Sequence, residues 1–272
     1  MFKKLGDQLS SPAMTLVKSF MSAALLGIVL SLIGFTKFSN NALMLLIASG
    51  VLGIAFGDTL FFAALKELMP HTLIMLLTGG QVLTILLAVV FLGDKPTPTA
   101  WAGMALVISG IFLVVRANLS AEKKKSPLKG IVLGGLSVAC MSTSYVIAKK
   151  PLDEPGSAME ATFIRMVAGG ITMLIIFLFT GQAKNWWQPF RNSGLLGQFF
   201  LSVAMITFGG FWLTFVAFKQ LNVSIASTLT SVEPLFVLPL GLIFLREKVT
   251  VTAVAGSIVA VTGIALICLP KH

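Results

Sequence analysis

The sequence predicts an all-α membrane protein with a duplicated plan. Hydrophobic residues make up 56% of its 272 residues and charged residues only 11%, whereas a soluble globular domain carries roughly 25% charge. Nearly all of the apolar residues fall in runs of about 17 to 25, the length at which a helix crosses a hydrocarbon core of roughly 30 Å. The runs lack the strict in-and-out alternation of a membrane β-barrel. We therefore expect transmembrane helices.

A repeated segment relates the two halves of the chain. Residues 57–113 align with residues 210–266 at a constant offset of 153, without a gap. Identical pairs fix the register, among them Gly57/Gly210, Phe62/Phe215, Lys66/Lys219, Gly103/Gly256 and Gly110/Gly263. Repeated units of membrane proteins commonly meet around a central substrate site, so the duplication favours transport.

Nine transmembrane helices are predicted, four before a basic linker and five after it. The first run, residues 15–34, follows Lys3 and Lys4 as in a signal peptide, but it is long, lacks a small-residue cleavage pattern and precedes many further spans. We interpret it as a retained helix. The first half, residues 1–115, continues with spans at residues 42–65, 72–92 and 99–115. After the linker, residues 116–129, the second half covers residues 130–272, with spans at residues 130–148, 158–179, 195–218, 224–245 and 252–269.

The offset also predicts that the first half lacks its opening helix. The counterpart of residues 130–148 would lie upstream of Met1, and residues 15–34 instead match residues 158–179, with Lys18 opposite Arg165. Two interpretations stay open at this point: a protein of nine spans, or a start position assigned too late. Halves with an odd number of spans are inverted relative to one another, so we expect two inverted repeats.

The basic character of the chain is typical of membrane anchoring. The formal net charge is +10, and most Lys and Arg residues lie at span ends and in loops, where they set topology. We therefore expect membrane lipid and a small molecule as partners, and no nucleic acid. Cys140 and Cys268 lie within apolar spans and lack metal-ligand spacing, so we expect no metal and no cofactor.

Glu233 and Pro234 interrupt an apolar span of the second half. They lie near the middle of the predicted span 224–245, where a charged side chain costs on the order of 2.5 to 3.5 kcal/mol and proline frees a backbone carbonyl. Thr230 extends the same polar face by helical spacing. Glu233 is expected to line a cavity, where it binds a cation or carries a proton, or else to be protonated and bonded to a neighbouring helix.

The matching stripe of the first half is neutral. Gly80 and Gln81 occupy the positions of Glu233 and Pro234, and Thr78 lies on the same face as Gln81. An amide only donates and accepts hydrogen bonds. Gln81 and Thr78 therefore either line the same cavity or hold two helices together.

Two further charges and two neutral side chains complete the candidate pathway. Asp58 is a candidate proton or cation site, or a salt-bridge partner or cap for another helix. Arg165 suits a carboxylate of the protein or of an anionic substrate, while snorkelling of Arg165 and Lys18 toward the interface is the alternative. Ser144 gives its span a mildly polar edge, and Trp212 is either a cavity wall or a core filler.

These residues resemble the EamA-like domain of the drug/metabolite transporter superfamily over essentially the whole chain. The motifs are GDTLFFAAL at residues 57–65 and FLGDK at residues 91–95, with Glu233-Pro234 and FLREK at residues 244–248 in the second copy. The resemblance implies a ten-helix fold of two inverted five-helix halves that moves small metabolites by alternating access. The chain departs from it in three ways: the opening helix is missing, Gln81 replaces a frequent proline, and Asp94 replaces a glutamate.

The sequence thus predicts a multi-pass secondary transporter of the cell (inner) membrane, and no enzyme. We expect it to move an amino acid or related metabolite, by proton coupling or by exchange, and leave its oligomeric state open, a homodimer included. A non-transporting assembly or receptor subunit is the alternative. An intramembrane enzyme is disfavoured, because Gly57-Asp58 lacks a second catalytic aspartate within a span.

Overall fold

A computed structural model of the chain describes residues 10–68, 70–119, 127–180, 193–230 and 251–267. All regular structure in these ranges is helical, so the all-α prediction is confirmed. In chain order the helices, with η for π-helix, are α2 (Ser11–Ile33), α3 (Asn40–Gly50), η1 (Val51–Asp58), α4 (Thr59–Glu67), α5 (Pro70–Leu92), α6 (Pro98–Leu119), α7 (Pro127–Leu152), α8 (Ala158–Phe179), α9 (Ser193–Met205), η4 (Ile206–Trp212), α10 (Leu213–Gln220), α11 (Val223–Thr230) and α13 (Val251–Ile267).

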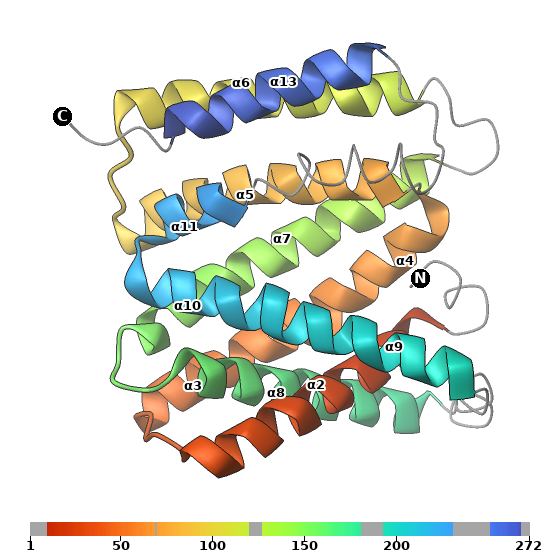
Figure 1. The fold of residues 1–272 in the computed structure, drawn as a ribbon, viewed down its shortest axis with the longest axis vertical. Coiled ribbons are helices and arrows are strands. Elements are labelled where there is room, and N and C mark those ends of the chain that lie inside the picture. Colours follow the sequence, from red (N-terminus) through yellow and green to blue (C-terminus); the bar gives the residue numbers. More distant parts are fainter. Residues whose placement is uncertain (1–9, 69, 120–126, 181–192, 231–250, 268–272) are drawn as a thin grey trace.

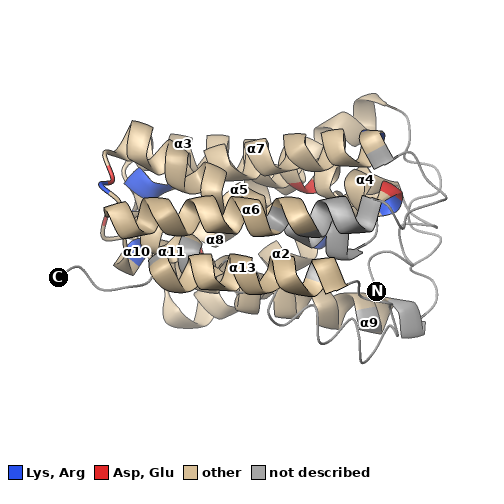
Figure 2. Cartoon of the chain, turned by 90° about the horizontal axis from the view of Figure 1, so that it is seen from above, with Lys and Arg blue, Asp and Glu red and all other residues tan. Residues whose placement is uncertain are grey.

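The helices have the length and composition of membrane spans. Five described stretches are long and apolar enough to cross a bilayer: Ser11–Ile33, Asn40–Glu67, Leu128–Leu152, Ala158–Phe179 and Phe199–Gln220. Shorter apolar helices cover Gly79–Leu92 and Val254–Leu266. Figure 2 shows the charged residues of the described chain mostly near the two ends of the helices. Each predicted span is helical wherever its residues are described, except that the first ends at Ile33 with Gly34 as its C-cap, and the number of nine crossings stays a prediction.

Serine side chains begin three of the helices. The hydroxyl oxygens of Ser10, Ser39 and Ser157 accept hydrogen bonds from backbone N–H groups in the first turns of α2, α3 and α8. Each serine thereby satisfies one of the N–H groups that a helix start leaves unpaired. In a bilayer such groups have no water to bind, so these caps fix where the spans begin.

α6 and α13 form a separate pair at one end of the long axis in Figure 1. They pack on each other more extensively than any other two described helices. A Cβ atom at Gly110 would collide with the Gly256 carbonyl, and one at Gly263 would lie 2.5 Å from the Gly103 carbonyl. The offset of 153 maps each contact onto the other, because Gly110 matches Gly263 and Gly256 matches Gly103. Both helices therefore run antiparallel and make reciprocal contacts, as elements related by a two-fold axis do.

Polar contacts join the loops at one end of the helices. The Asp94 carboxylate accepts from the backbone N–H of Ser224, 3.1 Å away, and from its hydroxyl, and so caps α11. Glu154 accepts from the backbone and hydroxyl of Ser39, and these hydrogen bonds lower the pKa of the Glu154 carboxyl below its usual range. Asp94 therefore has a structural role at the end of a span.

The glycine contacts of α6 and α13 generate a prediction. Gly263→Ala places a methyl group against the backbone of α6 and should destabilise the protein by about 1–3 kcal/mol, the usual cost of overpacking. Gly135→Ala in α7 is the matched control, since a Cβ there meets nothing within 4 Å. Thermal unfolding in detergent measures both variants. Equal melting temperatures for the two would show that the close approach of α6 and α13 is not required.

Candidate functional site

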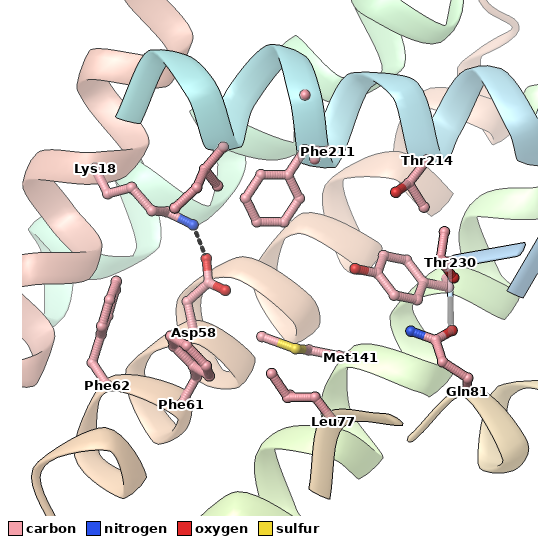
Figure 3. Close-up of a pocket in the computed structure, with 14 residues that line it drawn as sticks. Lys18, Asp58, Phe61, Phe62, Leu77, Gln81, Met141, Phe211, Thr214 and Thr230 are labelled. Atoms are coloured by element: carbon pink, nitrogen blue, oxygen red, sulfur yellow. Dashed lines mark hydrogen bonds and ion pairs between the residues drawn. The ribbon is translucent and has the colours of Figure 1, made fainter. Parts of the chain in front are cut away.

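A cavity of about 460 Å³ lies between helices of both halves. The first half contributes α2, η1, α4 and α5 to its wall, and the second half contributes α7, η4, α10 and α11 (Figure 3). Six of its fourteen described lining residues have apolar side chains, and two more are glycines. The polar residues of the described lining are Lys18, Asp58, Gln81, Tyr145, Thr214 and Thr230. An apolar pocket with a few convergent polar groups is the usual form of a small-molecule site.

Two π-helical segments border the cavity at matching places in the repeats. η1 ends at Asp58, and η4 contains Gly209, Gly210 and Phe211, which all line the cavity. With the offset of 153, Asp58 matches Phe211. A π turn inserts an extra residue into the helical repeat, and such turns are frequent at functional sites. Because the extra residue changes the direction of the side chains around it, helical spacing alone does not predict which of them reach the cavity.

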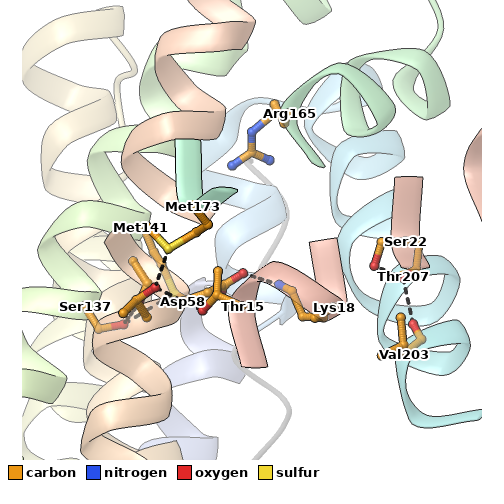
Figure 4. A network of polar contacts seen from close by, with 12 residues as sticks. Thr15, Lys18, Ser22, Asp58, Ser137, Met141, Arg165, Met173, Val203 and Thr207 are labelled. Atoms are coloured by element: carbon orange, nitrogen blue, oxygen red, sulfur yellow. Dashed lines mark hydrogen bonds and ion pairs between the residues drawn. The ribbon is translucent and has the colours of Figure 1, made fainter. Parts of the chain in front are cut away.

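Asp58 is paired with Lys18. The Lys18 ammonium donates to the Asp58 carboxylate, and the two side chains are only 3% and 5% exposed (Figures 3 and 4). The Lys18 Nζ atom also lies 4.5 Å from the centre of the Phe211 ring. The structure therefore has the salt bridge that was one of two alternatives for Asp58. Snorkelling was the wrong interpretation of Lys18, because its ammonium points into the protein and not to the interface.

Arg165 is not part of the described cavity lining. In the described part of the chain, no carboxylate forms a hydrogen bond or an ion pair with it. Its side chain is almost fully buried, and its Nη2 donates to the Ser144 hydroxyl over 2.7 Å. The guanidinium carbon lies 4.3 Å from the centre of the Phe215 ring and 5.6 Å from that of Tyr145. The Nε and Nη1 groups have no hydrogen-bond partner among the described residues. Snorkelling is therefore wrong for Arg165 too.

Ser144 acts as a support for Arg165. Its hydroxyl bonds the Ser49 carbonyl oxygen over 2.8 Å, and the Ser49 hydroxyl returns a hydrogen bond to the Ser144 carbonyl. The three helices α3, α7 and α8 meet at this point. Ser144 was predicted as a pathway residue, but it is outside the described lining of the cavity. Its hydroxyl accepts a hydrogen bond from Arg165 and so helps to position the guanidinium.

The remaining candidate residues divide into three groups. Gln81 and Thr230 both line the cavity and lie on the side opposite Lys18 in Figure 3. Trp212 is absent from the described lining and packs edge-to-face on Phe208, with ring centres 6.1 Å apart. The core-filler alternative therefore describes it. Glu233 and Pro234, and the side chain of Thr78, lie outside the described part of the structure.

Several lining residues were not predicted. Lys18 was considered only as the counterpart of Arg165. Its positive charge, opposite to that of Asp58, was the feature of the sequence that could have indicated the pairing. Phe61, Tyr145 and Thr214 carry no such signal, because aromatic and threonine side chains are common throughout membrane helices. Gly210 was recognised as a repeat position, and its role in leaving space at the cavity depends on the tertiary arrangement.

Comparisons with known proteins agree with this architecture. The model of the EamA-like transporter family matches residues 1–116 and 128–269. An uncharacterized transporter of Bacillus subtilis (strain 168), YyaM, is 24% identical over 148 residues, which are 54% of this chain and 48% of the relative. The chain thus matches about half the length of this curated relative. A solved crystal structure superposes with a TM-score of 0.69 over 99% of this chain and 94% of its own, and its 14% identity supports the fold alone.

The buried ion pair generates a second prediction. Asp58→Asn leaves the Lys18 ammonium without its counter-charge and should destabilise the protein by about 3–5 kcal/mol, whereas Lys18→Met/Asp58→Asn should recover much of the loss. The matched control is the Lys129–Glu67 pair, with side chains 63% and 26% exposed; its disruption should cost at most about 1 kcal/mol. A double-mutant cycle from detergent unfolding measures both. Additive effects of Lys18 and Asp58 would contradict the pairing.

Proposed function

Because the chain belongs to the EamA-like transporter family, we propose that it is a secondary transporter that carries a small metabolite through this cavity by alternating access. The working substrate class is an amino acid or a related compound, and the working location is the inner, or plasma, membrane. The family model covers both halves of the chain, and the protein is a multi-pass membrane protein by its apolar helices.

The observation that carries the proposal is the position of the cavity between the halves. Its described wall takes residues from both, with Lys18, Asp58 and Gln81 in the first and Tyr145, Thr214 and Thr230 in the second. A site at the interface of two repeats becomes accessible from either side when one repeat rocks against the other. The same wall then serves both states, so substrate is held while access changes.

The loop contacts at one end of the helices are consistent with such a movement. The contacts of Asp94 with Ser224 and of Glu154 with Ser39 each join a loop of one half to the other half. Rocking of the repeats would separate these loops and break the hydrogen bonds there. We therefore assign them to one of the two gates of the transport cycle.

Glu233 is the proposed coupling residue. A carboxylate that carries protons has to be free to gain and lose them during the cycle. The Lys18 ammonium already neutralises Asp58, which makes Asp58 the weaker candidate. Counterflow that keeps its full pH dependence in Glu233→Gln would refute the assignment and would favour exchange without protons.

A cavity-filling substitution tests the transport site. A Cβ at Gly210 has only one neighbour, 4.0 Å away, and Gly210 lines the cavity. Gly210→Leu should therefore fill the cavity, fold normally and lower uptake by about tenfold or more. Gly197→Leu is the matched control: it lies earlier in the same helical stretch, outside the described lining, and a Cβ there meets nothing within 4 Å.

The measurement is uptake into proteoliposomes from a defined mixture of amino acids and their deaminated carboxylate analogues, read by mass spectrometry. We expect at least one compound to accumulate with the unmodified protein and with Gly197→Leu. If no compound accumulated, or if Gly210→Leu transported as well as the control, the proposed function of this cavity would be wrong.

A further inference from the structure

The charges around the cavity do not balance. Taken as whole residues, Lys18, Asp58 and Arg165 are 2%, 4% and 1% exposed, so all three are removed from water. One carboxylate thus faces two cations, and it is hydrogen-bonded to Lys18 alone. Buried charges in membrane proteins are normally paired, because an isolated one is costly in a medium of low dielectric constant. In the described part of the chain this set has an excess of one positive charge.

The excess charge resides on Arg165. Two of its three nitrogens, Nε and Nη1, have no hydrogen-bond partner among the described residues. The described groups in direct contact with it are neutral: the Ser144 hydroxyl accepts from Nη2, and the Phe215 ring faces the guanidinium. A buried donor without an acceptor loses its hydrogen bonds to water and gains none in return. Among the described residues, Arg165 therefore has no acceptor that carries negative charge.

Tyr145 connects Arg165 to the cavity. Tyr145 is part of the cavity lining, and the guanidinium carbon of Arg165 lies over its ring, 5.6 Å from the ring centre. Arg165 thus contacts a lining residue without belonging to the described lining itself. A rotation of the Tyr145 ring would open the Arg165 guanidinium to a ligand. The Phe215 ring would remain in contact with the guanidinium. A guanidinium that keeps its ring contact stays oriented for binding.

The remaining wall suits an apolar body. Phe61, Phe62, Leu77, Met141 and Phe211 face the cavity. The volume of about 460 Å³ lies in the range of small-molecule pockets, roughly 300–1,000 Å³. A ligand that fits both features has a compact apolar part and one anionic group.

We propose that the cavity binds a small organic monocarboxylate with an apolar body, whose carboxylate accepts a hydrogen bond from Arg165, through its Nε–H or through Nη1. A hydrogen bond between a guanidinium and a carboxylate is charge-assisted and stronger than a neutral one. A single negative charge balances the set formed by Lys18, Asp58 and Arg165 while Glu233, the proposed coupling residue, is protonated. A dianion such as a phosphate ester would leave an excess of negative charge. The inference rests on the proposed function and narrows its substrates to compounds that carry a carboxylate without a balancing ammonium group.

Four ligands with one apolar body test the charge requirement. They are 3-phenylpropionate, its neutral amide, 3-phenylpropylamine and the zwitterion phenylalanine. Labelled 3-phenylpropionate is bound at equilibrium to the purified full chain in detergent, and the other three compete with it unlabelled. We expect each competitor to bind at least about tenfold more weakly than the carboxylate, because each loses a charge-assisted bond or adds an unbalanced charge.

Two substitutions locate the charge. Arg165→Gln should weaken binding of 3-phenylpropionate by about tenfold or more and reduce its preference over the amide. Arg165→Lys keeps the charge but loses the planar guanidinium. Its affinity for 3-phenylpropionate should lie between those of the unmodified protein and Arg165→Gln. Lys129→Gln is the matched control, since it removes an exposed cation outside the described cavity lining. If the Arg165 variants do not fold, the ligand series on the unmodified protein still decides the charge requirement.

Three results would overturn the inference: equal affinity for the amide and the carboxylate, tighter binding of phenylalanine or of the amine, or no binding of 3-phenylpropionate. Any of these would leave the proposed function standing if proteoliposomes still took up a compound from the mixture in a manner that Gly210→Leu abolishes. Loss of that uptake in the unmodified protein would instead remove the transport proposal itself.

Discussion

The buried ion pair between Lys18 and Asp58 is the interaction on which the centre of the molecule depends. A charged side chain at bilayer depth is stable only with a partner or in a polar cavity, and here each charge is the partner of the other. The pair joins α2 to the end of η1. It therefore positions α2, which also packs along α8 and is tied to η4 by the 2.7 Å hydrogen bond between Ser22 and Thr207 (Figure 4).

The two repeats keep one scaffold and differ at the cavity. The reciprocal contacts of Gly110 with Gly256 and of Gly263 with Gly103 preserve the internal symmetry at the α6–α13 pair. At the cavity, by contrast, a Cβ at Gly57 would lie 3.1 Å from Met141, while its counterpart Gly210 faces open space. The same glycine thus serves close packing in one half and leaves space at the cavity in the other. The scaffold is symmetric, whereas the cavity lining is not.

Much of this arrangement could be predicted from the sequence. The spans follow from hydropathy, because a helix must be apolar over its whole length to face lipid. Asp58, Gln81 and Thr230 were expected at a cavity because polar groups in lipid are costly, and they line it. Trp212 could not be distinguished from Phe211, because η4 changes the direction of successive side chains. The Lys18–Asp58 pair joins residues 40 apart in sequence, and such contacts depend on the rotation of each helix.

The distribution of polar contacts over the two halves bears on how they can move. The buried ion pair lies within the first half, and Arg165 with its ring contacts lies within the second. The described hydrogen bonds that cross between the halves at this depth come from neutral hydroxyls. Examples are Ser137 to the Gly57 carbonyl and Ser142 to the Gly80 carbonyl, 2.8 Å and 2.9 Å in length.

Such neutral bonds are weak in membranes, about 0.6 kcal/mol on average, whereas breaking a buried ion pair costs several kcal/mol. The proposed rocking of one half against the other would therefore exchange neutral hydrogen bonds at this depth and leave the ion pair intact, while the carboxylate contacts of Asp94 and Glu154 would break at the loop end. If the charges were paired across the interface, the same movement would have to separate them in a dry environment, and the barrier would be too high for rapid turnover. The placement of the described charges is thus compatible with the rocking movement proposed above.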